Sequence, residues 1–345
     1  MAKTVLVCEA QVPFVQGGAE IHVRELVGQL RQHGHAVELV SVPFKWYPKP
    51  EILAHAAAWR LLDLGESNGR PIDLVIATKF PTYFARHPNK VVWLIHQHRA
   101  AYELAGTPFS DFAHTEDDVA IRSEIVALDT AMLKECTRRY ANAANTAARA
   151  KRFNGLSVEP LYHPPRLAER LRAGPSGAYV LAVSRLESVK RLDLAIRAMA
   201  HAPAAVSLKV VGVGTQRAVL DALVSSLGLG HRVAFLGEVA DDEIIDLYAG
   251  ALGVIFPPYD EDFGYVTLEA FLAHKPVVTT TDAGGPTEFV QDGVSGWVTA
   301  PDAAAIGDAI GRLDADRGRA ARLGDAGYER ARQVTWAGVV ETLVG

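Results

Sequence analysis

"YVLAVSRLESVKRLDLAI" (residues 179–196) passes from an apolar run into a charged turn and then into a helical pattern. The run at 179–183 is apolar and rich in β-branched and aromatic residues, which is typical of a buried strand. A strand that leads directly into a helix is the unit from which parallel sheets are built. The stretch therefore predicts an α/β fold for the part of the chain around it.

The same alternation of short apolar runs and helical patterns fills nearly the whole chain. We expect helices at 19–32, where Ile21, Leu26, Val27 and Leu30 fall on one face, at 116–139, and from 303 to about 343. We expect strands at 4–8, 36–42, 73–78, 91–95, 158–162, 179–183, 207–211, 233–236, 254–256, 277–280 and 297–299. This order predicts the α/β fold class, with parallel sheets covered by helices on both faces.

A segment rich in Pro, Gly and Arg, "HPPRLAERLRAGPSGAY" at 163–179, divides the alternation into two halves of similar size. A chain of 345 residues exceeds the usual size of a single core, so this linker predicts two domains. We expect an N-terminal domain at 1–165, a C-terminal domain at 176–332, and a last helix at about 333–345 that packs back on the first domain. Ligands of open parallel sheets bind beyond the carboxyl ends of the strands, so we expect two Rossmann-like domains facing a central cleft.

Composition narrows the class of protein. A net charge of −5 and an isoelectric point near 6.2 argue against a nucleic-acid-binding protein. The two cysteines, Cys8 and Cys136, have no spacing typical of a metal site or a disulfide and indicate a reducing compartment. The apolar run that opens the chain predicts a strand rather than a signal peptide, and no run approaches the ~20 apolar residues of a membrane span. We therefore expect a cytoplasmic protein.

Glycines follow strands in both halves. Gly17 and Gly18, in "QVPFVQGGAEIHVREL", open the helix after the first strand, where free backbone amides suit a phosphate or a sugar. An ordinary strand–helix turn explains this pair equally well. The other candidate, "VVGVGTQR" with Gly212 and Gly214, also lacks the complete Gly-x-Gly-x-x-Gly pattern, so neither indicates a dinucleotide site.

Cations and histidines follow other strands. Arg185 stands directly after the strand at 179–183, and Lys190 and Arg191 start the next helix; guanidinium and ammonium groups there suit phosphate oxygens, although a solvated surface cluster is the alternative. In "VVWLIHQHR", alternation places His96 and His98 on one face of a strand end and Gln97 on the other. A structural role is as reasonable as a binding role for either histidine alone.

Two carboxylates in "EDFGYVTLE" (261–269) form the third group. Glu261 falls in a loop, Glu269 falls about one turn inside a helix, and the amides of Phe263, Gly264 and Tyr265 would face an anion at the start of that helix. Three chemistries use such acids: a glycosidase acid/base pair, a metal site at Asp260 and Asp262, or a clamp on a polyol. No sugar groove is evident beside the pair, and the metal-dependent transferases with Asp-x-Asp have one nucleotide-binding domain.

The chain resembles the retaining glycosyltransferases of family four, the glycosyl transferases group 1, which have the two-domain GT-B fold. The motifs that carry the resemblance occur in order over nearly the whole length: "GGAE", "GHAVELV", "DLVIATK", "SRLESVKR", "VVGVG", "VAFLGEV", Glu261-x7-Glu269, "KPVVTTTDAGGPTEFV", "DGVSGWV" and "VTWAGVVETL". The stretch "HQHRAAYELAGTPFSDF" (96–112) departs from the pattern where the acceptor should bind.

The resemblance implies a role for each matching residue. Glu269 would hold the ribose of a UDP- or GDP-sugar, and Glu261, with the amides of Phe263 and Gly264, would hold the transferred hexosyl group. Arg185 and Lys190 would neutralise the leaving diphosphate in place of a metal, so no cofactor is expected. Gly18 would let the backbone close over the donor, and His96 would approach the sugar, with His98 in reserve. Closure about the 163–179 linker would exclude water.

The acceptor is a hydroxyl of a sugar, a glycolipid or a small molecule on this interpretation. Lys79, His98, Arg99 and Tyr102 follow strands of the first domain and would line its site, with two cations beside an aromatic ring. A further group of basic residues is predicted to form the solvated side of two helices, or to contact the inner face of a membrane peripherally. This basic run consists of Lys134, Arg138, Arg139, Arg149, Lys151 and Arg152.

Three rival functions stay open. A sugar-nucleotide epimerase of the same fold would bind the same donor without an acceptor. A nicotinamide-dependent oxidoreductase is disfavoured by the missing glycine fingerprint. A non-catalytic nucleotide-sugar-binding protein is disfavoured because the arginine, the lysine and both glutamates are present.

Overall fold

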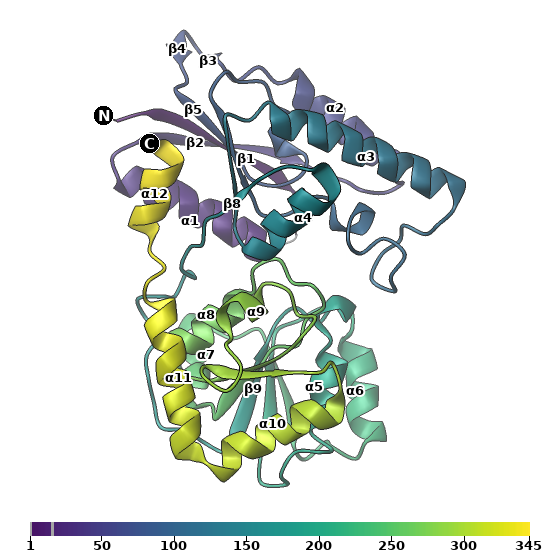
Figure 1. Ribbon diagram of the computed structural model, residues 1–345, viewed down its shortest axis with the longest axis vertical. Coiled ribbons are helices and arrows are strands. Elements are labelled where there is room, and N and C mark those ends of the chain that lie inside the picture. The colour runs from purple at the N-terminus through teal and green to yellow at the C-terminus, as the bar shows by residue number, and fades with distance from the viewer. Residues whose placement is uncertain (1, 15–16) are drawn as a thin grey trace. The chain divides into compact units, whose positions relative to one another are not determined.

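The computed structural model describes residues 2–14 and 17–345 and consists of two compact units (Figure 1). Unit 1 comprises Met1–His163 and Thr335–Gly345, and unit 2 comprises Pro164–Val334. Each unit is built on a six-stranded sheet whose neighbouring strands run parallel. The α/β fold class expected from the alternation of apolar runs and helical patterns is confirmed.

The sheet of unit 1 has the strand order β2-β1-β5-β6-β7-β8. Its strands are β1 (Thr4–Gln11), β2 (Ala36–Pro43), β5 (Leu74–Ala77), β6 (Lys90–Leu94), β7 (Arg138–Ala141) and β8 (Glu159–Pro160). Every residue of β5 and β6 is buried, because central parallel strands are covered on both faces. A short antiparallel hairpin, β3 (Glu66–Ser67) and β4 (Arg70–Pro71), turns at Asn68 and Gly69, which both have positive φ.

Successive side chains of these strands enter two separate cores. Val5 and Val7 of β1 pack with α1 (Gly18–Gln32) and α12 (Trp336–Val344) on one face. Leu6 packs on the other face, in the core that is covered by α2 (Glu51–Leu61), α3 (Glu116–Lys134) and α4 (Ala144–Asn154). Successive side chains of a strand point to opposite faces of the sheet. One apolar run therefore packs against helices on both faces.

The last helix, α12, is held on unit 1 by its apolar side chains and by two cations at its carboxyl end. Arg138 of β7 donates from Nη1 to the Thr342 carbonyl and from Nη2 to the Leu343 carbonyl, both at 3.0 Å. Lys3 donates to the Val344 carbonyl. These carbonyls have no partner inside the helix, and positive charge near them also favours the helix dipole.

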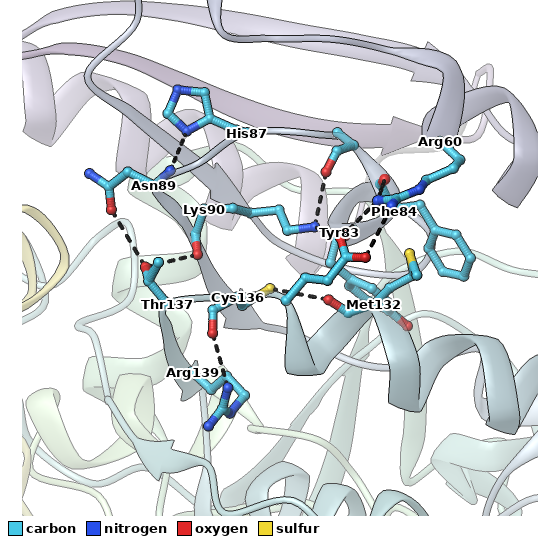
Figure 2. A network of polar contacts seen from close by, with 12 residues as sticks. Arg60, Tyr83, Phe84, His87, Asn89, Lys90, Met132, Cys136, Thr137 and Arg139 are labelled. Atoms are coloured by element: carbon cyan, nitrogen blue, oxygen red, sulfur yellow. Dashed lines mark hydrogen bonds and ion pairs between the residues drawn. The ribbon is translucent and has the colours of Figure 1, made fainter.

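The amino edge of the unit 1 sheet is organised around a buried lysine, Lys90, at the start of β6 (Figure 2). Its Nζ donates to the carbonyls of Tyr83 (2.6 Å) and Ala85 (2.9 Å), which flank the end of the 3₁₀ turn Thr82–Phe84, and lies 3.6 Å from a carboxylate oxygen of Glu135. Glu135 also accepts from Arg60 of α2. All of these partners belong to unit 1 itself, and Lys90 lies at the end of the sheet opposite the carboxyl ends of the strands. We therefore assign Lys90 a structural role.

Unit 2 has the strand order β11-β10-β9-β12-β13-β14. One core cluster takes alternate strand residues such as Val180 and Ile255, while Leu181 and Val254, which alternate with them along their strands, are buried outside that cluster. Its strands are β9 (Tyr179–Val183), β10 (Ser207–Val211), β11 (Val233–Gly237), β12 (Gly253–Ile255), β13 (Val277–Thr280) and β14 (Gly296–Thr299). Its helices are α5 (Leu192–Ala198), α6 (Arg217–Ser226), α7 (Asp241–Gly250), α8 (Tyr265–Leu272), α9 (Pro286–Phe289), α10 (Ala303–Ala315) and α11 (Arg317–Ala331). A side chain at Gly327 of α11 would meet the Phe271 ring at 2.2 Å, so this glycine permits close packing of α11 on α8.

The helix expected at 116–139 is too long. It ends at Lys134, and residues 138–141 form β7, so the basic run does not follow one solvated helix side. Arg138 is used on α12, and Arg149 is buried beside Glu103. In α1 the buried residues include Val23, Leu26, Val27 and Leu30, whereas Ile21 is exposed, because at about 100° per residue it lies on the side of the helix opposite Val23.

The segment expected as a linker is fastened to unit 2. Arg166 pairs with Asp241 of α7, and Arg170 pairs with both Asp241 and Asp242. Further along, Lys275 donates to the Gly174 carbonyl at 2.8 Å. The arginines that suggested a solvated linker therefore dock it on a helix with an acidic first turn.

Candidate active site

Arg185 lies directly beyond the carboxyl end of β9 and is exposed. No hydrogen bond or ion pair of its guanidinium is found within residues 2–14 and 17–345. The glycines after β10 decide its backbone surroundings: Gly212 has φ +126, and a side chain there would meet the Ser184 carbonyl oxygen at 2.0 Å. The absence of a side chain at Gly212 lets the loops after β9 and β10 touch, next to the turn that carries Arg185. The assignment of Gly212 to the donor site stays a prediction.

Lys190 and Glu261 form a close ion pair at the same sheet edge. Lys190 ends the 3₁₀ turn Ser188–Lys190, and its Nζ lies 2.6 Å from each carboxylate oxygen of Glu261. Both side chains keep a small exposed fraction, 13% and 15%. From the sequence we expected Lys190 to contact phosphate and Glu261 to contact the sugar. In the structure the two side chains form one ion pair.

Glu269 of α8 is oriented by a tyrosine that the sequence did not single out. The hydroxyl of the fully buried Tyr248, on α7, donates to Glu269 Oε2 at 2.7 Å. Burial raises the pKa of Glu269, and the Tyr248 hydroxyl and the Arg166 charge oppose this rise. The carboxylate is thereby held in one orientation, with Oε1 available as a hydrogen-bond acceptor. No periodicity or motif distinguishes Tyr248 from an ordinary core tyrosine.

The turn before α8 depends on Gly264, which has φ +82 and no room for a side chain, because Pro286 and Phe256 lie within 3.1 Å of a Cβ position. Phe263 is buried against Phe289, so its side chain anchors the turn. Tyr265 begins the helix, as expected. The backbone amides of this turn stand next to Glu261 in the chain, at the carboxyl edge of the sheet.

In unit 1 the glycine turn is controlled by a buried ion pair. Glu20 accepts from the Gly17 amide through Oε2 (2.9 Å) and from Lys79 Nζ through Oε1 (2.7 Å), and both charged side chains are only 8% exposed. Gly18 is the first residue of α1. Burial alone would raise the pKa of Glu20, but the Lys79 charge and these hydrogen bonds outweigh it and lower the pKa. Lys79 therefore supports the glycine turn through Glu20, and its assignment as an acceptor contact stays a prediction.

The two histidines diverge. Strand β6 ends at Leu94, so the strand alternation expected to place His96 and His98 together does not extend to them. His96 is half-buried, and its Nδ1 lies 2.7 Å from the Gln97 carbonyl oxygen, which is a hydrogen-bond acceptor. His98 packs against Phe44, Phe80 and Phe112, and burial, together with His96, lowers its pKa to about 4.

The remaining acceptor candidates are mostly internal. Tyr102 is 1% exposed, and its hydroxyl donates to the buried Asp129 at 2.6 Å, so it belongs to the core rather than to a surface ring. Arg99 pairs with Glu103, which also lies 2.9 Å from Arg149 Nε. Sequence reasoning missed Arg149 because it lies 50 positions from Arg99 in the chain; Glu103 lies only four positions away and could have been found.

Two features are absent from the part of the chain that the structure describes. Over the described ranges 2–14 and 17–345, no group of three or more His, Cys, Asp or Glu side chains is arranged to hold a metal ion. Among the same residues, no helix combines the length and the apolar character that crossing a membrane requires.

Part of the chain matches a known family model and several curated relatives. The glycosyl transferases group 1 family model matches residues 166–330. The D-inositol 3-phosphate glycosyltransferase of Nocardia farcinica is 28% identical over 277 residues, which are 73% of this chain and 61% of that protein. Its namesake from Salinispora tropica is 37% identical over 192 residues, 52% of this chain and 40% of that protein. The chain thus spans less than two thirds of the length of these relatives.

Solved structures give the fold. Anabaena HepE in complex with UDP and glucose aligns with a TM-score of 0.73 at 21% identity, over 99% of this chain and 98% of that one. Sucrose-phosphate synthase from Thermosynechococcus elongatus aligns with a TM-score of 0.73 at 20% identity, over 99% and 97%. A likeness at this identity shows the fold alone. Together the matches show that residues 166–330 are similar to the glycosyl transferases group 1 family and that the chain has the GT-B fold of these solved structures.

Proposed function

We propose that the protein is a glycosyltransferase that moves a hexosyl group from a nucleoside-diphosphate sugar to an acceptor hydroxyl, with retention of the anomeric configuration and without a metal ion. The observation that carries this proposal is the Lys190–Glu261 pair beside the exposed Arg185, at the carboxyl edge of the domain that matches the group 1 family model. Cations there suit a diphosphate, and a carboxylate suits sugar hydroxyls.

The reaction breaks the bond between the anomeric carbon and the β-phosphate oxygen and forms a bond from that carbon to the acceptor oxygen. Negative charge grows on the leaving diphosphate, where Arg185 and Lys190 stabilise it. The acceptor proton passes to the leaving phosphate oxygen on the same face of the sugar, so charge and atoms balance and no external cofactor is consumed. Glu261 keeps Lys190 in place and accepts hydrogen bonds from the sugar.

Glu269 binds the ribose through Oε1 in this proposal, since Tyr248 already occupies Oε2. In unit 1 the Gly17 amide already donates to Glu20, and the donor roles expected for Gly18 and His96 stay predictions. The presence of UDP in the HepE complex supports a uridine donor, and GDP is the alternative to be tested beside it.

The acceptor is proposed to be a small hydroxylated molecule or a sugar, with a glycolipid at a membrane surface as the next class. The names of the relatives support D-inositol 3-phosphate as the first acceptor to test. We keep Arg99 as the candidate acceptor contact, because Lys79 is paired with Glu20 and Tyr102 is hydrogen-bonded to Asp129 inside unit 1. We place the reaction in the cytoplasm, with membrane contact at most peripheral.

The test is incubation of the protein with a panel of UDP- and GDP-sugars, with and without D-inositol 3-phosphate and simple sugars. Nucleotide release that depends on an acceptor, an α-linked product from an α-linked donor, and activity that survives EDTA are the expected results. An Arg185→Ala variant is the matched control for contaminating activity. Conversion of the donor sugar without an acceptor would favour an epimerase. If the protein binds donors but turns over no combination of donor and acceptor, it is a nucleotide-sugar-binding protein without activity.

A further inference from the structure

Arg191 connects three segments at the carboxyl edge of the unit 2 sheet. It precedes α5 in a left-handed conformation (φ +49°, ψ +41°), and its side chain is 14% exposed. Nε donates to the Pro257 carbonyl at 2.8 Å, and Nη2 donates to the Pro258 carbonyl at 2.7 Å. The guanidinium therefore joins the turn after β9 to the loop after β12.

The same guanidinium also reaches the end of β13. Nη1 and Nη2 form a bidentate pair with the carboxylate of Asp282, at 2.8 and 2.6 Å, and Nη2 lies 2.9 Å from Thr280 Oγ1. Burial alone would raise the pKa of Asp282, but the hydrogen bonds from Arg191 outweigh it and lower the pKa. The charge of Arg191 is thus neutralised within the protein. The sequence had suggested a phosphate contact for this residue, and the geometry does not fit that role.

The three segments joined by Arg191 are those that present the Lys190–Glu261 pair. Lys190 is the preceding residue in the chain, and Glu261 lies within the loop that starts at Pro257 and leads to α8. Backbone bonds follow the same connections: Tyr259 donates to the Val189 carbonyl, and Glu261 donates to the Ala283 carbonyl, both at 2.8 Å. An ion pair with both Nζ–O distances at 2.6 Å requires the two loops to keep one relative position.

We propose that Arg191 is a positioning residue of the donor site, which holds the turn after β9 against the loops after β12 and β13 and so fixes Lys190 opposite Glu261. The inference rests on the proposed function for its effect on turnover. Its effect on the loop itself does not depend on any activity.

Glycine is the informative replacement at this position. A left-handed residue at φ +49° is comfortable for glycine, so Arg191→Gly removes the side chain without opposing the backbone. Arg191→Lys keeps the charge but loses the planar fork. Arg197→Gln, on the exposed side of the same helix, is the matched control.

The first measurement is hydrogen exchange of the full-length protein over residues 255–264. Arg191→Gly is expected to speed exchange in this loop by about 10-fold or more, because the opening free energy of the loop falls. Arg191→Lys is expected to fall between Arg191→Gly and the wild type, and Arg197→Gln to match the wild type. Unchanged exchange in Arg191→Gly would overturn the inference whether or not the protein is a transferase. If Arg191→Gly does not fold, Asp282→Asn replaces it and is expected to speed the same peptides to a smaller extent.

The second measurement is a double-mutant cycle with Lys190→Ala in the transfer assay. Arg191→Gly is expected to lower kcat by about 10- to 100-fold with little change in donor KM, and the double variant is expected to be no slower than Lys190→Ala within about 3-fold. Multiplicative losses, or a loss of nucleoside-diphosphate binding by calorimetry in Arg191→Gly alone, would show an independent contact with the donor. A wild type inactive with every donor would remove the proposed function and leave the exchange result to decide the positioning role.

Discussion

The carboxyl edges of the two sheets carry similar residue types in different states. In unit 2, Arg185 is exposed, Lys190 and Glu261 keep exposed fractions, and Glu269 is held by one tyrosine hydroxyl. In unit 1, Lys79 is buried on Glu20, Arg99 is paired with Glu103, and Tyr102 lies in the core. Of these residues, the exposed Arg185 is the clearest candidate for a ligand contact, and the buried, paired Lys79 is the clearest candidate for a brace of a turn.

The largest expected effect tests the bracing role in unit 1. Lys79→Met leaves the Glu20 carboxylate buried without its cation, which typically costs about 3–5 kcal/mol of stability. We expect faster hydrogen exchange in α1 and parallel losses of transfer and of donor hydrolysis. The double variant Lys79→Met/Glu20→Gln should recover much of the stability, since no buried charge remains unpaired. Normal stability with a selective loss of transfer would instead return Lys79 to the acceptor site.

The next effect tests the binding role in unit 2. Arg185→Ala is expected to lower the single-turnover rate by about 10²–10³-fold, because one electrostatic contact to the leaving group is lost. Its thermal midpoint should stay near that of the wild type, since the side chain is exposed. Lys190→Ala should lower the rate similarly and also disturb Glu261. A near-normal rate in Arg185→Ala would remove this residue from the mechanism.

A smaller effect concerns the buried polar group behind Tyr102. Burial raises the pKa of Asp129 from 3.8 to about 7, and the Tyr102 hydroxyl only partly opposes it. Since the folded state holds its proton more tightly than the unfolded state, the stability contribution is present below pH 4 and is lost as pH rises to about 7. Unit 1 should lose roughly 1–3 kcal/mol over this range.

Asp129→Asn should abolish this pH dependence, whereas Asp117→Asn, at an exposed position of the same helix, should not. Hydrogen exchange of α3 peptides, compared between variants at each pH, measures the effect. Identical pH profiles for wild type and Asp129→Asn would show that the buried carboxyl does not titrate in this range.

The smallest effect separates the two acids of unit 2. Glu269→Gln should weaken binding of UDP by about 10-fold, which is the value of one charged hydrogen bond, and Tyr248→Phe should weaken it less. Glu261→Gln should leave UDP binding within about 3-fold and depress transfer. Because burial raises the pKa of Glu269, UDP affinity should also fall as the solution becomes acidic. Calorimetry decides, and equal weakening by both Gln variants would contradict the division.

The sequence by itself determined the α/β class, most strands and the residue types at the donor edge. Apolar runs of period two and a strand–turn–helix order are local properties, so 179–183, 207–211 and 277–280 were predicted with their observed bounds. Arg185 was found because it follows such a run directly, whereas the roles of Lys190, Glu261 and Glu269 came from the resemblance to a family. The boundary at Lys134 was missed, because a helix and the strand after it share a similar mix of apolar and basic residues.

Only the tertiary structure decided which charges are free and which are used inside the protein. The partners of Lys79, Arg191 and Tyr102 lie 59, 91 and 27 positions away along the chain. The Tyr248 hydroxyl reaches Glu269 across two helices, 21 positions apart. Burial and pairing arise when loops after different strands meet at one sheet edge, and neither has a local signature in the amino-acid order. Two arginines that follow the same strand, β9, therefore have different surroundings: Arg185 is exposed, and Arg191 is enclosed.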